Sequence, residues 1–274
     1  MRKELTAVIL TKEEGARVER CVSSLSQFSK LIIIDTFSTD ETFEQVRMAW
    51  KQLGRASHDL MFLSREWKGF TDARNFSLRW VRTEWVLWID ADEWIESDLD
   101  LELSRVKFSE LQGDVYSIAR KSFYLGQWVR FGGWYPDFKR RLGRVGAIEW
   151  KRGPRNADVH ENLFSIEKRG EVARMDGHFG HEPFKDKREH RETNWRYSSL
   201  LAEGLASQYH RGEKRVYSYP EVFIKVLVKF FENYVLKLGF LDGRVGFLIA
   251  RGSAQSLFWR LTKARKLFKQ WKAL

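Results

Sequence analysis

Four short apolar segments alternate with amphipathic segments over the first ninety residues of the chain. The apolar segments have the length and composition of buried strands; they are residues 5–10, 31–34, 60–63 and 85–89. Between them, apolar side chains recur at helical spacing; they are Val18, Cys21, Val22, Leu25 and Phe28 in the first interval, and Ala73, Phe76 and Trp80 in the third. This alternation predicts right-handed crossovers and a parallel sheet covered by helices on both faces.

Two capping signals predict where further helices begin. Ser38 and Glu41 have the spacing of a capping box before the second amphipathic segment. Ser218, a first-turn proline and Glu221 predict the start of a helix that runs to Gly239. The polar side chains of that helix form one narrow stripe, which consists of Lys225, Lys229, Glu232, Asn233 and Lys237. Because the rest of its circumference is apolar, the helix is either buried or laid on a membrane.

The pattern changes beyond about residue 113, where short strands alternate with loops rich in glycine, arginine and aromatic residues. Examples are Gly132-Gly-Trp-Tyr-Pro136 and Lys139-Arg-Arg141. From about Trp195 onward the sequence is helical in character. We therefore expect one domain over residues 1–194, divided into halves at residues 1–112 and 113–194, and a helical region over residues 195–274.

Polar side chains follow three of the four predicted strands. Thr11 and Glu14 come after the first strand, Asp35 after the second, and Asp90 and Asp92 after the fourth. In parallel sheets, ligands bind beyond the carboxyl ends of the strands. We therefore expect these five side chains to line one crevice.

The segment Asp90-Ala-Asp-Glu93 carries the strongest chemical signal. Side chains two apart on an extended chain point to the same side, so Asp90 and Asp92 can converge where the strand ends. Paired carboxylates suit a hard divalent cation, whose remaining coordination is filled by water and substrate phosphates. The alternative is an acidic turn that is merely solvated.

No glycine-rich phosphate loop accompanies these carboxylates. Neither G-x-G-x-x-G nor G-x-x-x-x-G-K-S/T follows any of the predicted strands. The usual means of holding a nucleotide phosphate are therefore absent from the sequence. We expect a bound Mg²⁺ or Mn²⁺ to take their place.

The formal charge of +11 favours polyanionic partners, namely nucleic acid, anionic lipid or phosphorylated sugars. No zinc-ligand spacing or RNA-binding signature favours nucleic acid. The single cysteine, Cys21, excludes an intramolecular disulfide and is expected in a helix core. No run reaches the roughly 18 apolar residues of a membrane span, and the N-terminus does not resemble a signal peptide, so we expect a cytoplasmic protein.

With these residues placed, the chain resembles the family 2 glycosyltransferases of GT-A fold, in particular the lipopolysaccharide inner-core glucosyltransferases of the WaaE/KdtX type. The matching segments are Ala7-Val-Ile-Leu-Thr-Lys12, Ile33-Ile-Asp-Thr-Phe-Ser-Thr-Asp40, Trp67-Lys-Gly-Phe70, Arg74-Asn75-Phe76, Asp90-Ala-Asp-Glu93, Gly132-Gly-Trp-Tyr-Pro136, Val159-His-Glu161 and Tyr234-Val-Leu-Lys-Leu-Gly-Phe-Leu-Asp-Gly243. The resemblance covers nearly the whole chain. It implies an α/β protein with a Rossmann-like, mostly parallel sheet flanked by helices, and a C-terminal helical extension.

Two segments depart from the family pattern. Lys12-Glu13-Glu14 stands where the family usually has Lys-Asn-Glu, and Phe37 stands where the family usually has glycine in Asp-Ser-Gly-Ser-Thr-Asp. Both departures fall at the expected nucleotide pocket, where they bear on the choice of nucleotide and sugar.

The resemblance implies an inverting transfer of a hexose, expected to be glucose, from a UDP-sugar to a lipopolysaccharide inner-core heptose or a similar glycolipid. Such a transfer needs a base for the acceptor hydroxyl and a counter-charge for the departing diphosphate. For the counter-charge we expect Mg²⁺ or Mn²⁺ held by Asp92, with Asp90 and His178 completing the metal site. For the base we expect Glu161. The alternatives are an ordinary hydrogen-bonding role for His178 and an arginine ion pair for Glu161.

The resemblance also implies which residues border the two substrates. Those expected to border the nucleotide sugar are Thr11, Glu14, Asp35, Arg74, Asp90 and Ala91. Those expected to contact the acceptor are Trp134, Tyr135, Arg140 and Arg141. Arg74 either binds phosphate, pairs with Asp35 or forms only a helix-cap salt bridge. The aromatic residues of the acceptor set alternatively do no more than form tight loops.

The basic and aromatic C-terminal helices fit an anionic membrane surface, so we expect a peripheral protein on the inner face of the inner membrane. Core packing of these helices is the alternative. Two other functions stay open: a glycosyltransferase with a protein or peptide acceptor, and a non-catalytic lipid- or nucleic-acid-binding protein. The intact pair of aspartates argues against the non-catalytic one.

Overall fold

The computed structural model describes residues 2–152, 161–167 and 172–272, and it divides into two compact units. Unit 1 comprises Met1–Arg120 and Asp137–His181. Unit 2 comprises Lys121–Pro136 and Glu182–Leu274. This division differs from the boundary expected at residue 194, because the first long C-terminal helix already begins at Lys187 and a hairpin from the middle of the chain packs with it.

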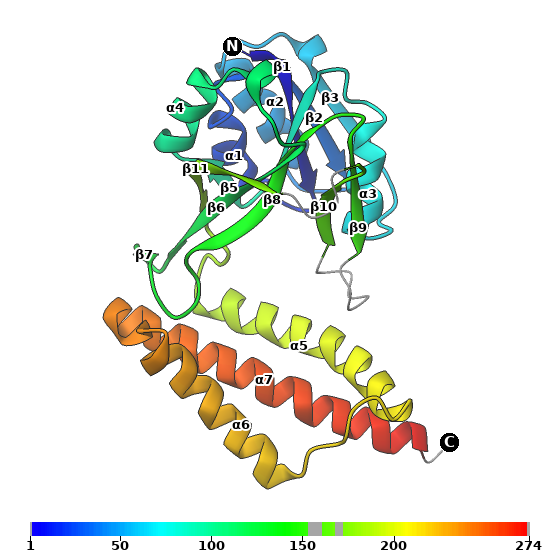
Figure 1. Cartoon of the computed structure of the whole chain (residues 1–274), viewed down its shortest axis with the longest axis vertical. Coiled ribbons are helices and arrows are strands. Elements are labelled where there is room, and N and C mark those ends of the chain that lie inside the picture. The colour runs from blue at the N-terminus through cyan, green and yellow to red at the C-terminus, as the bar shows by residue number, and fades with distance from the viewer. Residues whose placement is uncertain (1, 153–160, 168–171, 273–274) are drawn as a thin grey trace. The chain divides into compact units, whose positions relative to one another are not determined.

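Unit 1 is an α/β unit (Figure 1). Its strands are β1 (Arg2–Thr11), β2 (Phe28–Asp35), β3 (Leu60–Ser64), β4 (Trp85–Asp90), β5 (Glu93–Ile95), most of β6 (Val115–Tyr124), β8 (Asp137–Arg144), β9 (Ile148–Arg152), β10 (Glu161–Ser165) and β11 (Ala173–His181). Its helices are α1 (Val18–Ser23), α2 (Thr42–Gln52), α3 (Phe70–Leu78) and α4 (Ser97–Arg105), with short 3-10 turns at η1 (Ser57–Asp59) and η2 (Phe108–Glu110).

The four predicted strands are present and lie parallel to one another, in the order β3-β2-β1-β4. The sheet then continues with β8, β6, β11 and β5. The pairs β4–β8, β8–β6 and β11–β5 are antiparallel. The sheet is therefore mixed rather than mostly parallel. In the described part of the chain, β9 and β10 form a separate antiparallel hairpin.

Alternate side chains of the parallel strands enter two different apolar cores. Ala7 and Ile9 face the core that contains α1, α2 and α4, whereas Val8 faces the core beneath α3 and the β9–β10 hairpin. This alternation is the period of two that an extended chain imposes. The sheet is thus covered on both faces, as the near-continuous apolar strands predicted.

Two sequence-based expectations about local structure are wrong. The first helix ends at Ser23, and Phe28 opens β2 instead of extending the helical face. Ser38 does not cap α2, because its hydroxyl donates to Asp35 and accepts from the Glu13 N–H. The Asp40 carboxylate accepts from the Thr42 N–H at the start of α2 instead.

Unit 2 contains the end of β6, its antiparallel partner β7 (Gln127–Val129), and the C-terminal helices. These helices are α5 (Lys187–His210), α6 (Tyr219–Phe231) and α7 (Gly243–Lys272), with a π-helical turn η3 (Glu232–Leu236) and a 3-10 turn η4 (Gly239–Asp242). The predicted capping box of Ser218 and Glu221 is present at the start of α6. Asn233 is buried, so it does not belong to the expected polar stripe.

Small side chains let α5 and α7 pack closely: Ala202, Ala206 and Ala264 are fully buried there. None of the described helices combines the length and apolarity that crossing a membrane demands.

Candidate active site

The carboxyl ends of β1, β2 and β4 bring the predicted polar residues to one edge of the sheet. Thr11 lies opposite Asp35 in the parallel register, and Leu10 lies opposite Asp90. The register therefore places the three strand ends side by side. This edge is where ligands bind in parallel α/β sheets.

Asp35 is buried and fully engaged at this edge. It accepts hydrogen bonds from the Thr11 hydroxyl (2.8 Å), the Ser38 N–H (2.8 Å) and the Ser38 hydroxyl (2.6 Å). The following Phe37 has a φ of 57°, a left-handed conformation that glycine adopts without steric cost, and its side chain is exposed. Phe37 therefore takes the backbone conformation of a glycine and adds an exposed aromatic ring at this edge of the sheet.

Glu14 lies at the start of the segment that leads from β1 to α1. Its backbone N–H donates to the Thr42 hydroxyl (2.9 Å), and its carboxylate pairs with Arg17 at 3.3 Å. Unlike Asp35, the Glu14 side chain is partly exposed. It borders the same edge of the sheet as Thr11.

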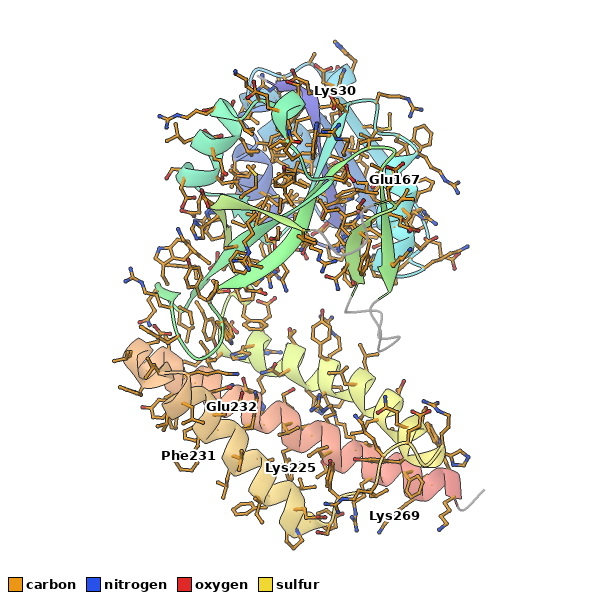
Figure 2. The ribbon with its side chains drawn as sticks, viewed as in Figure 1. Lys30, Glu167, Lys225, Phe231, Glu232 and Lys269 are labelled. Carbon is orange, nitrogen blue, oxygen red and sulfur yellow. The ribbon has the colours of Figure 1, made fainter. Side chains whose placement is uncertain are left out.

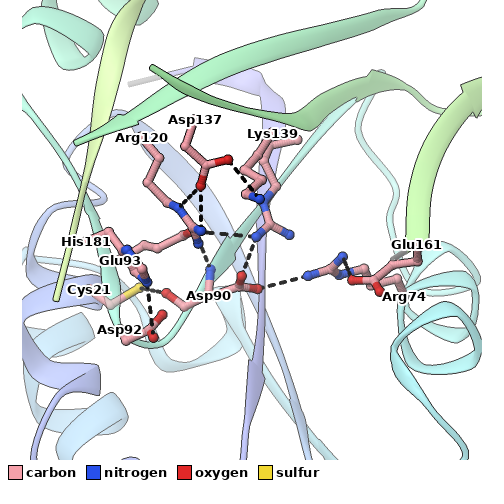
Figure 3. A network of polar contacts seen from close by, with 11 residues as sticks. Cys21, Arg74, Asp90, Asp92, Glu93, Arg120, Asp137, Lys139, Glu161 and His181 are labelled. Atoms are coloured by element: carbon pink, nitrogen blue, oxygen red, sulfur yellow. Dashed lines mark hydrogen bonds and ion pairs between the residues drawn. The ribbon is translucent and has the colours of Figure 1, made fainter. Parts of the chain in front are cut away.

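Asp90 is held by two guanidinium groups (Figure 3). The Asp90 Oδ1 atom pairs with Arg74 at 2.9 Å, and Oδ2 pairs with Arg141. Burial would raise the pKa of Asp90, but the charges of Arg141 and Arg74 outweigh it and hold that pKa well below its usual value. Asp90 is therefore a stable anion locked between two cations.

Arg74 joins Asp90 to Glu161. The Arg74 guanidinium is 3% exposed and contacts the Glu161 Oε1 atom at 2.5 Å, as well as Asp90. It therefore pairs with these two acids and not with Asp35. The Glu161 Oε2 atom is buried and has no hydrogen-bond partner among the described residues. Val159 and His160 of the predicted motif lie outside the described residues.

Glu93, Arg120 and Asp137 extend this network deeper into unit 1. Glu93 accepts from Arg120 at 2.8 Å and from the Asp90 N–H at 3.0 Å, and it is completely buried. Arg120 also pairs with Asp137 at 2.7 Å. Glu93 adjoins the two aspartates in sequence, but Arg120 and Asp137 lie on β6 and β8, so no sequence motif predicts a role for these three residues.

Asp92 differs from the other acids of this network in its partner. Its Oδ2 atom lies 3.5 Å from the Nε2 atom of His181, whereas Asp90, Glu93, Asp137 and Glu161 all pair with arginine. Burial would raise the pKa of Asp92, but the nearby His181 lowers it. The Asp92 side chain keeps 26% of its surface exposed, close to the 29% of Asp90, so the two acids differ in their partners and not in their exposure.

The two histidines of β11 point to different acids. The Nδ1 atom of His178 lies 2.7 Å from the Asp98 carboxylate, which accepts a hydrogen bond from it, and His181 lies beside Asp92. Residues three apart in a strand face opposite sides, so only one of the two can reach the aspartate pair.

The close approach of β11 to β5 requires Gly180, because a Cβ atom there would lie 2.0 Å from Trp94.

Two of the expected acceptor residues lie on β8 of unit 1. Arg141 is 4% exposed and turned toward Asp90 and Glu93, so it belongs to the network. Arg140, next to it on the opposite face of the strand, donates to the Leu163 carbonyl at 3.2 Å.

The other two expected acceptor residues belong to unit 2. Trp134 packs beside Tyr124 and Phe184. Tyr135 is 36% exposed. Their loop is tied to the turn before α7, since the Asp242 carboxylate accepts from the Phe131 N–H at 2.8 Å. The segment of residues 234–243, which matches the family pattern, therefore has a structural role.

The described residues contain no group of three or more His, Cys, Asp or Glu side chains arranged to hold a metal ion by themselves. Asp92 and His181 supply an oxygen and a nitrogen donor 3.5 Å apart. Hard dications commonly use one or two protein ligands and complete their coordination with water and substrate phosphates. The residues present therefore fit a cation that is shared with a diphosphate, centred on Asp92. Ala91, which is buried between the two aspartates, adds no donor atom from its side chain.

The chain is similar to glycosyltransferases of known name. The protein is 24% identical to the lipopolysaccharide core biosynthesis glycosyltransferase LpsC of Rhizobium meliloti (strain 1021) over 264 residues, which is 93% of this chain and 92% of LpsC. It is 25% identical to the glycosyltransferase SunS of Bacillus subtilis (strain 168) over 146 residues, or 47% of this chain. This match spans only 33% of the length of SunS.

The chain is also similar to solved structures, with TM-scores below 0.5. S. aureus TarS 1-349 in complex with UDP has a TM-score of 0.48 and 15% identity, with 97% of this chain and 92% of that chain covered. The mannosyltransferase PcManGT from Pyrobaculum calidifontis, in complex with GDP-Man and Mn²⁺, has a TM-score of 0.47 and 15% identity.

The decisive match is to a family profile. The profile described as Glycosyl transferase family 2 matches residues 6–149, which is more than half of the chain. This range begins in β1 and ends in β9, and it includes the aspartate pair and the Arg74–Asp90–Arg141 contacts. The chain belongs to glycosyl transferase family 2.

Proposed function

We propose that this protein is an inverting, divalent-metal-dependent hexosyltransferase that moves glucose from a UDP-sugar to a lipopolysaccharide inner-core heptose or a similar glycolipid. The observation that carries the proposal is the contrast within the aspartate pair: Asp90 is neutralised by two arginines, whereas Asp92 lies beside His181 and forms no ion pair with an arginine among the described residues. The similarity to LpsC over nearly its whole length supports a glycolipid acceptor over a protein or peptide acceptor.

Asp92 and His181 are the proposed ligands of Mg²⁺ or Mn²⁺, with His181 in the role that the sequence suggested for His178. When bound, the ion supplies positive charge to the departing diphosphate. Asp90 lies too firmly between Arg74 and Arg141 to be a strong ligand, so its proposed role is to fix the turn that presents Asp92. Thr11, Glu14, Asp35 and Ala91 are proposed to border the nucleotide sugar.

Glu161 is the proposed base for the acceptor hydroxyl. Arg74 binds its Oε1 atom, and the Oε2 atom has no partner among the described residues, so Oε2 can accept the proton. An unpartnered buried carboxylate oxygen is costly for a fold and needs an explanation. A hydroxyl group of the acceptor provides one. Trp134, Tyr135 and Arg140 stay proposed acceptor contacts.

A lipid-linked acceptor also implies where in the cell the protein acts. Lipopolysaccharide core precursors are anchored in a bilayer, so we propose that the protein works in the cytoplasm as a peripheral protein on the inner face of the inner membrane. The finding that no described helix is fit to cross a membrane is compatible with this placement.

The experiment that tests the proposal measures UDP release from UDP-glucose in the presence of a core glycolipid. Turnover should require Mn²⁺ or Mg²⁺, should stop in EDTA and should return when the metal is restored. Asp92→Asn should abolish it, whereas Asp98→Asn, which alters the acid bound to His178, should not. Full turnover in EDTA would show that no divalent metal is required. Turnover with a peptide in the absence of glycolipid would favour a protein or peptide acceptor.

A further inference from the structure

A stripe of exposed apolar side chains runs along α6. We call it the α6 apolar surface; its members are Phe223, Ile224, Leu227, Val228 and Phe231. The last four positions follow Phe223 by one, four, five and eight residues, so all five lie on one side of the helix. Four of them are between 55% and 63% exposed, and only Val222 of α6 is buried. Figure 2 shows Phe231 pointing outward from the helix.

The stripe continues beyond the end of α6. Leu236 is 77% exposed and Leu241 is 55% exposed in the turn that joins α6 to α7. On the other flank, Phe231 contacts Phe230, which in turn contacts Phe247 of α7. The apolar area therefore extends over two helices and their connecting turn. It is a contiguous patch and not a set of singly exposed residues.

Basic side chains border this area. Lys225 lies on one flank of α6, beside the Tyr217 ring. On α7, Arg244 and Arg251 are exposed and have the same helical phase as Phe247, and neither forms an ion pair within the described residues. Residues 243–274 contain eight lysines and arginines and no acidic residue.

The positive charge of the whole chain is concentrated in unit 2. This unit holds 21 of the 48 lysines and arginines but only 9 of the 37 acidic residues, for a net charge of +12. Unit 1 accordingly has a net charge of −1. An apolar stripe on a strongly basic unit matches the two attractions that hold interfacial helices on anionic bilayers, burial of apolar area and charge.

We propose that the α6 apolar surface enters the headgroup boundary of an anionic lipid bilayer, with Arg244 and Arg251 on the lipid phosphates. The inference rests on the proposed function for its biological setting, a lipid-linked acceptor, and identifies the surface that meets the lipid. A second copy of the chain fits less well, because it would bring two units of net charge +12 together.

The geometry sets the mode of contact. The 13 residues of α6 span about 20 Å, which is shorter than the roughly 30 Å hydrocarbon core of a bilayer. The helix therefore lies in the plane of the interface. Lys225, on the flank of the stripe, extends its ammonium group toward the headgroups.

Vesicle flotation of the full chain tests this proposal. With phosphatidylcholine vesicles containing phosphatidylglycerol, wild-type protein should float at low salt, and the bound fraction should fall as salt is raised. Pure phosphatidylcholine vesicles should retain at least about tenfold less. Failure of the wild-type protein to float with the anionic vesicles at low salt would overturn the proposal.

The decisive variant carries Ile224→Glu, Val228→Glu and Phe231→Glu, at positions whose side chains are 55% to 60% exposed. It should lose at least about tenfold in partitioning to anionic vesicles. Its matched control carries Leu101→Glu, Ile166→Glu and Leu200→Glu, at three similarly exposed positions outside the surface, and should float like wild type. Equal flotation of the two triple variants would overturn the assignment to α6, since both add the same charge.

Two further readouts separate this proposal from others. Thermal stabilisation by UDP and Mn²⁺ reports on the proposed function, so a protein that binds UDP but never floats refutes the bilayer contact alone. Sedimentation velocity reports on self-association. A wild-type dimer that the α6 triple variant converts to a monomer, without vesicle binding by either, would assign the surface to a second copy instead.

Discussion

Asp90 and Asp92 lie two residues apart, yet they have different kinds of partner. Two guanidinium groups hold Asp90, and a single imidazole lies beside Asp92. A carboxylate paired with two buried arginines contributes mainly to the structure, because removing it leaves their charges uncompensated. A carboxylate that has no arginine partner is better suited to a ligand. The two residues should therefore respond differently to the same substitution.

Asp90→Asn should lower the free energy of unfolding by about 3 kcal/mol, since it leaves Arg74 and Arg141 buried without their shared anion. Asp92→Asn leaves these pairs intact and should change that free energy by less than about 1 kcal/mol, while lowering divalent-dependent turnover at least about 100-fold. Urea unfolding followed by tryptophan fluorescence and the UDP-release assay measure the two effects. Equal destabilisation by both substitutions would contradict the division of roles.

The pH dependence of stability gives a second measure of the Asp90 ion pairs. The pKa of Asp90 is held low in the folded protein by Arg141 and Arg74 against the effect of burial. A carboxyl group with a lowered folded pKa stabilises the fold above its unfolded pKa of about 4, and this stabilisation disappears as the pH falls through the folded pKa. The stability difference between wild type and Asp90→Asn should stay constant above about pH 5 and narrow below about pH 4. A difference that widens on acidification would refute this account.

Glu161→Gln should separate binding from proton transfer. The amide oxygen can still accept from Arg74, so UDP and Mn²⁺ should bind with unchanged affinity, but the side chain can no longer take a proton. We expect kcat to fall by about 100-fold or more with little change in donor KM. Glu161→Asp, which keeps the carboxylate but shortens the reach, should restore part of the rate. Normal transfer by the Gln variant would discard Glu161 as the base.

At the scale of elements, β11 decides which histidine faces the aspartate pair. His178 and His181 belong to the same short motif, and the family resemblance favours His178 as the metal ligand. The antiparallel register with β5 sets His181 opposite Glu93 and brings its ring to Asp92. The motif alone does not contain that register, because it depends on how β11 pairs with β5, which lies about 85 residues earlier in the chain.

Helix α5 carries a histidine whose burial gives a separate test. His190 packs flat against Phe184, and the Tyr124 hydroxyl lies 2.9 Å from its Nδ1 atom. Burial lowers the pKa of His190 to about 4. Because the folded pKa lies below the unfolded value of about 6.5, His190 stabilises the fold fully above that value and loses this effect as the pH falls toward 4.

Wild-type protein should therefore lose roughly 3 kcal/mol of unfolding free energy through this group between pH 6.5 and pH 4. His190→Phe, which keeps a ring in the same space, should lack that loss. Tyr124→Phe removes only the hydrogen bond and should retain it. Urea unfolding at several pH values measures the slopes, and identical slopes for wild type and His190→Phe would show that the buried ring is not responsible.

At the scale of the whole molecule, the two units should respond to different ligands. UDP with Mn²⁺ should slow amide exchange in unit 1 around residues 9–15, 33–38 and 88–93, since these segments form the carboxyl edge of the sheet. At a hundredfold excess over its Kd, a ligand adds about 2.7 kcal/mol of stability to what it binds. Anionic vesicles should slow exchange in α6 instead. Hydrogen exchange with mass spectrometry distinguishes the two, and protection by UDP that is confined to α6 and α7 would contradict the position of the site.

Sequence alone determined the elements whose signals are local. The four parallel strands follow from short apolar runs, and their carboxylates fall at one edge because strand direction and side-chain alternation are fixed by the backbone. The start of α6 follows from Ser218 and Glu221, whose capping interactions span a single turn. The apolar character of α6 was also readable, although both a buried and a membrane-bound helix satisfied it.

Only the tertiary structure decided the contacts that join distant segments. Arg74, Asp90, Arg141 and Glu161 come from α3, β4, β8 and β10, and no periodicity relates them. Ser38 has the spacing of a helix cap, but its hydroxyl donates to Asp35 instead. Whether α6 is covered, which histidine meets Asp92 and where the chain divides all depend on how elements pack, and packing is a property of the assembled core rather than of any one stretch of residues.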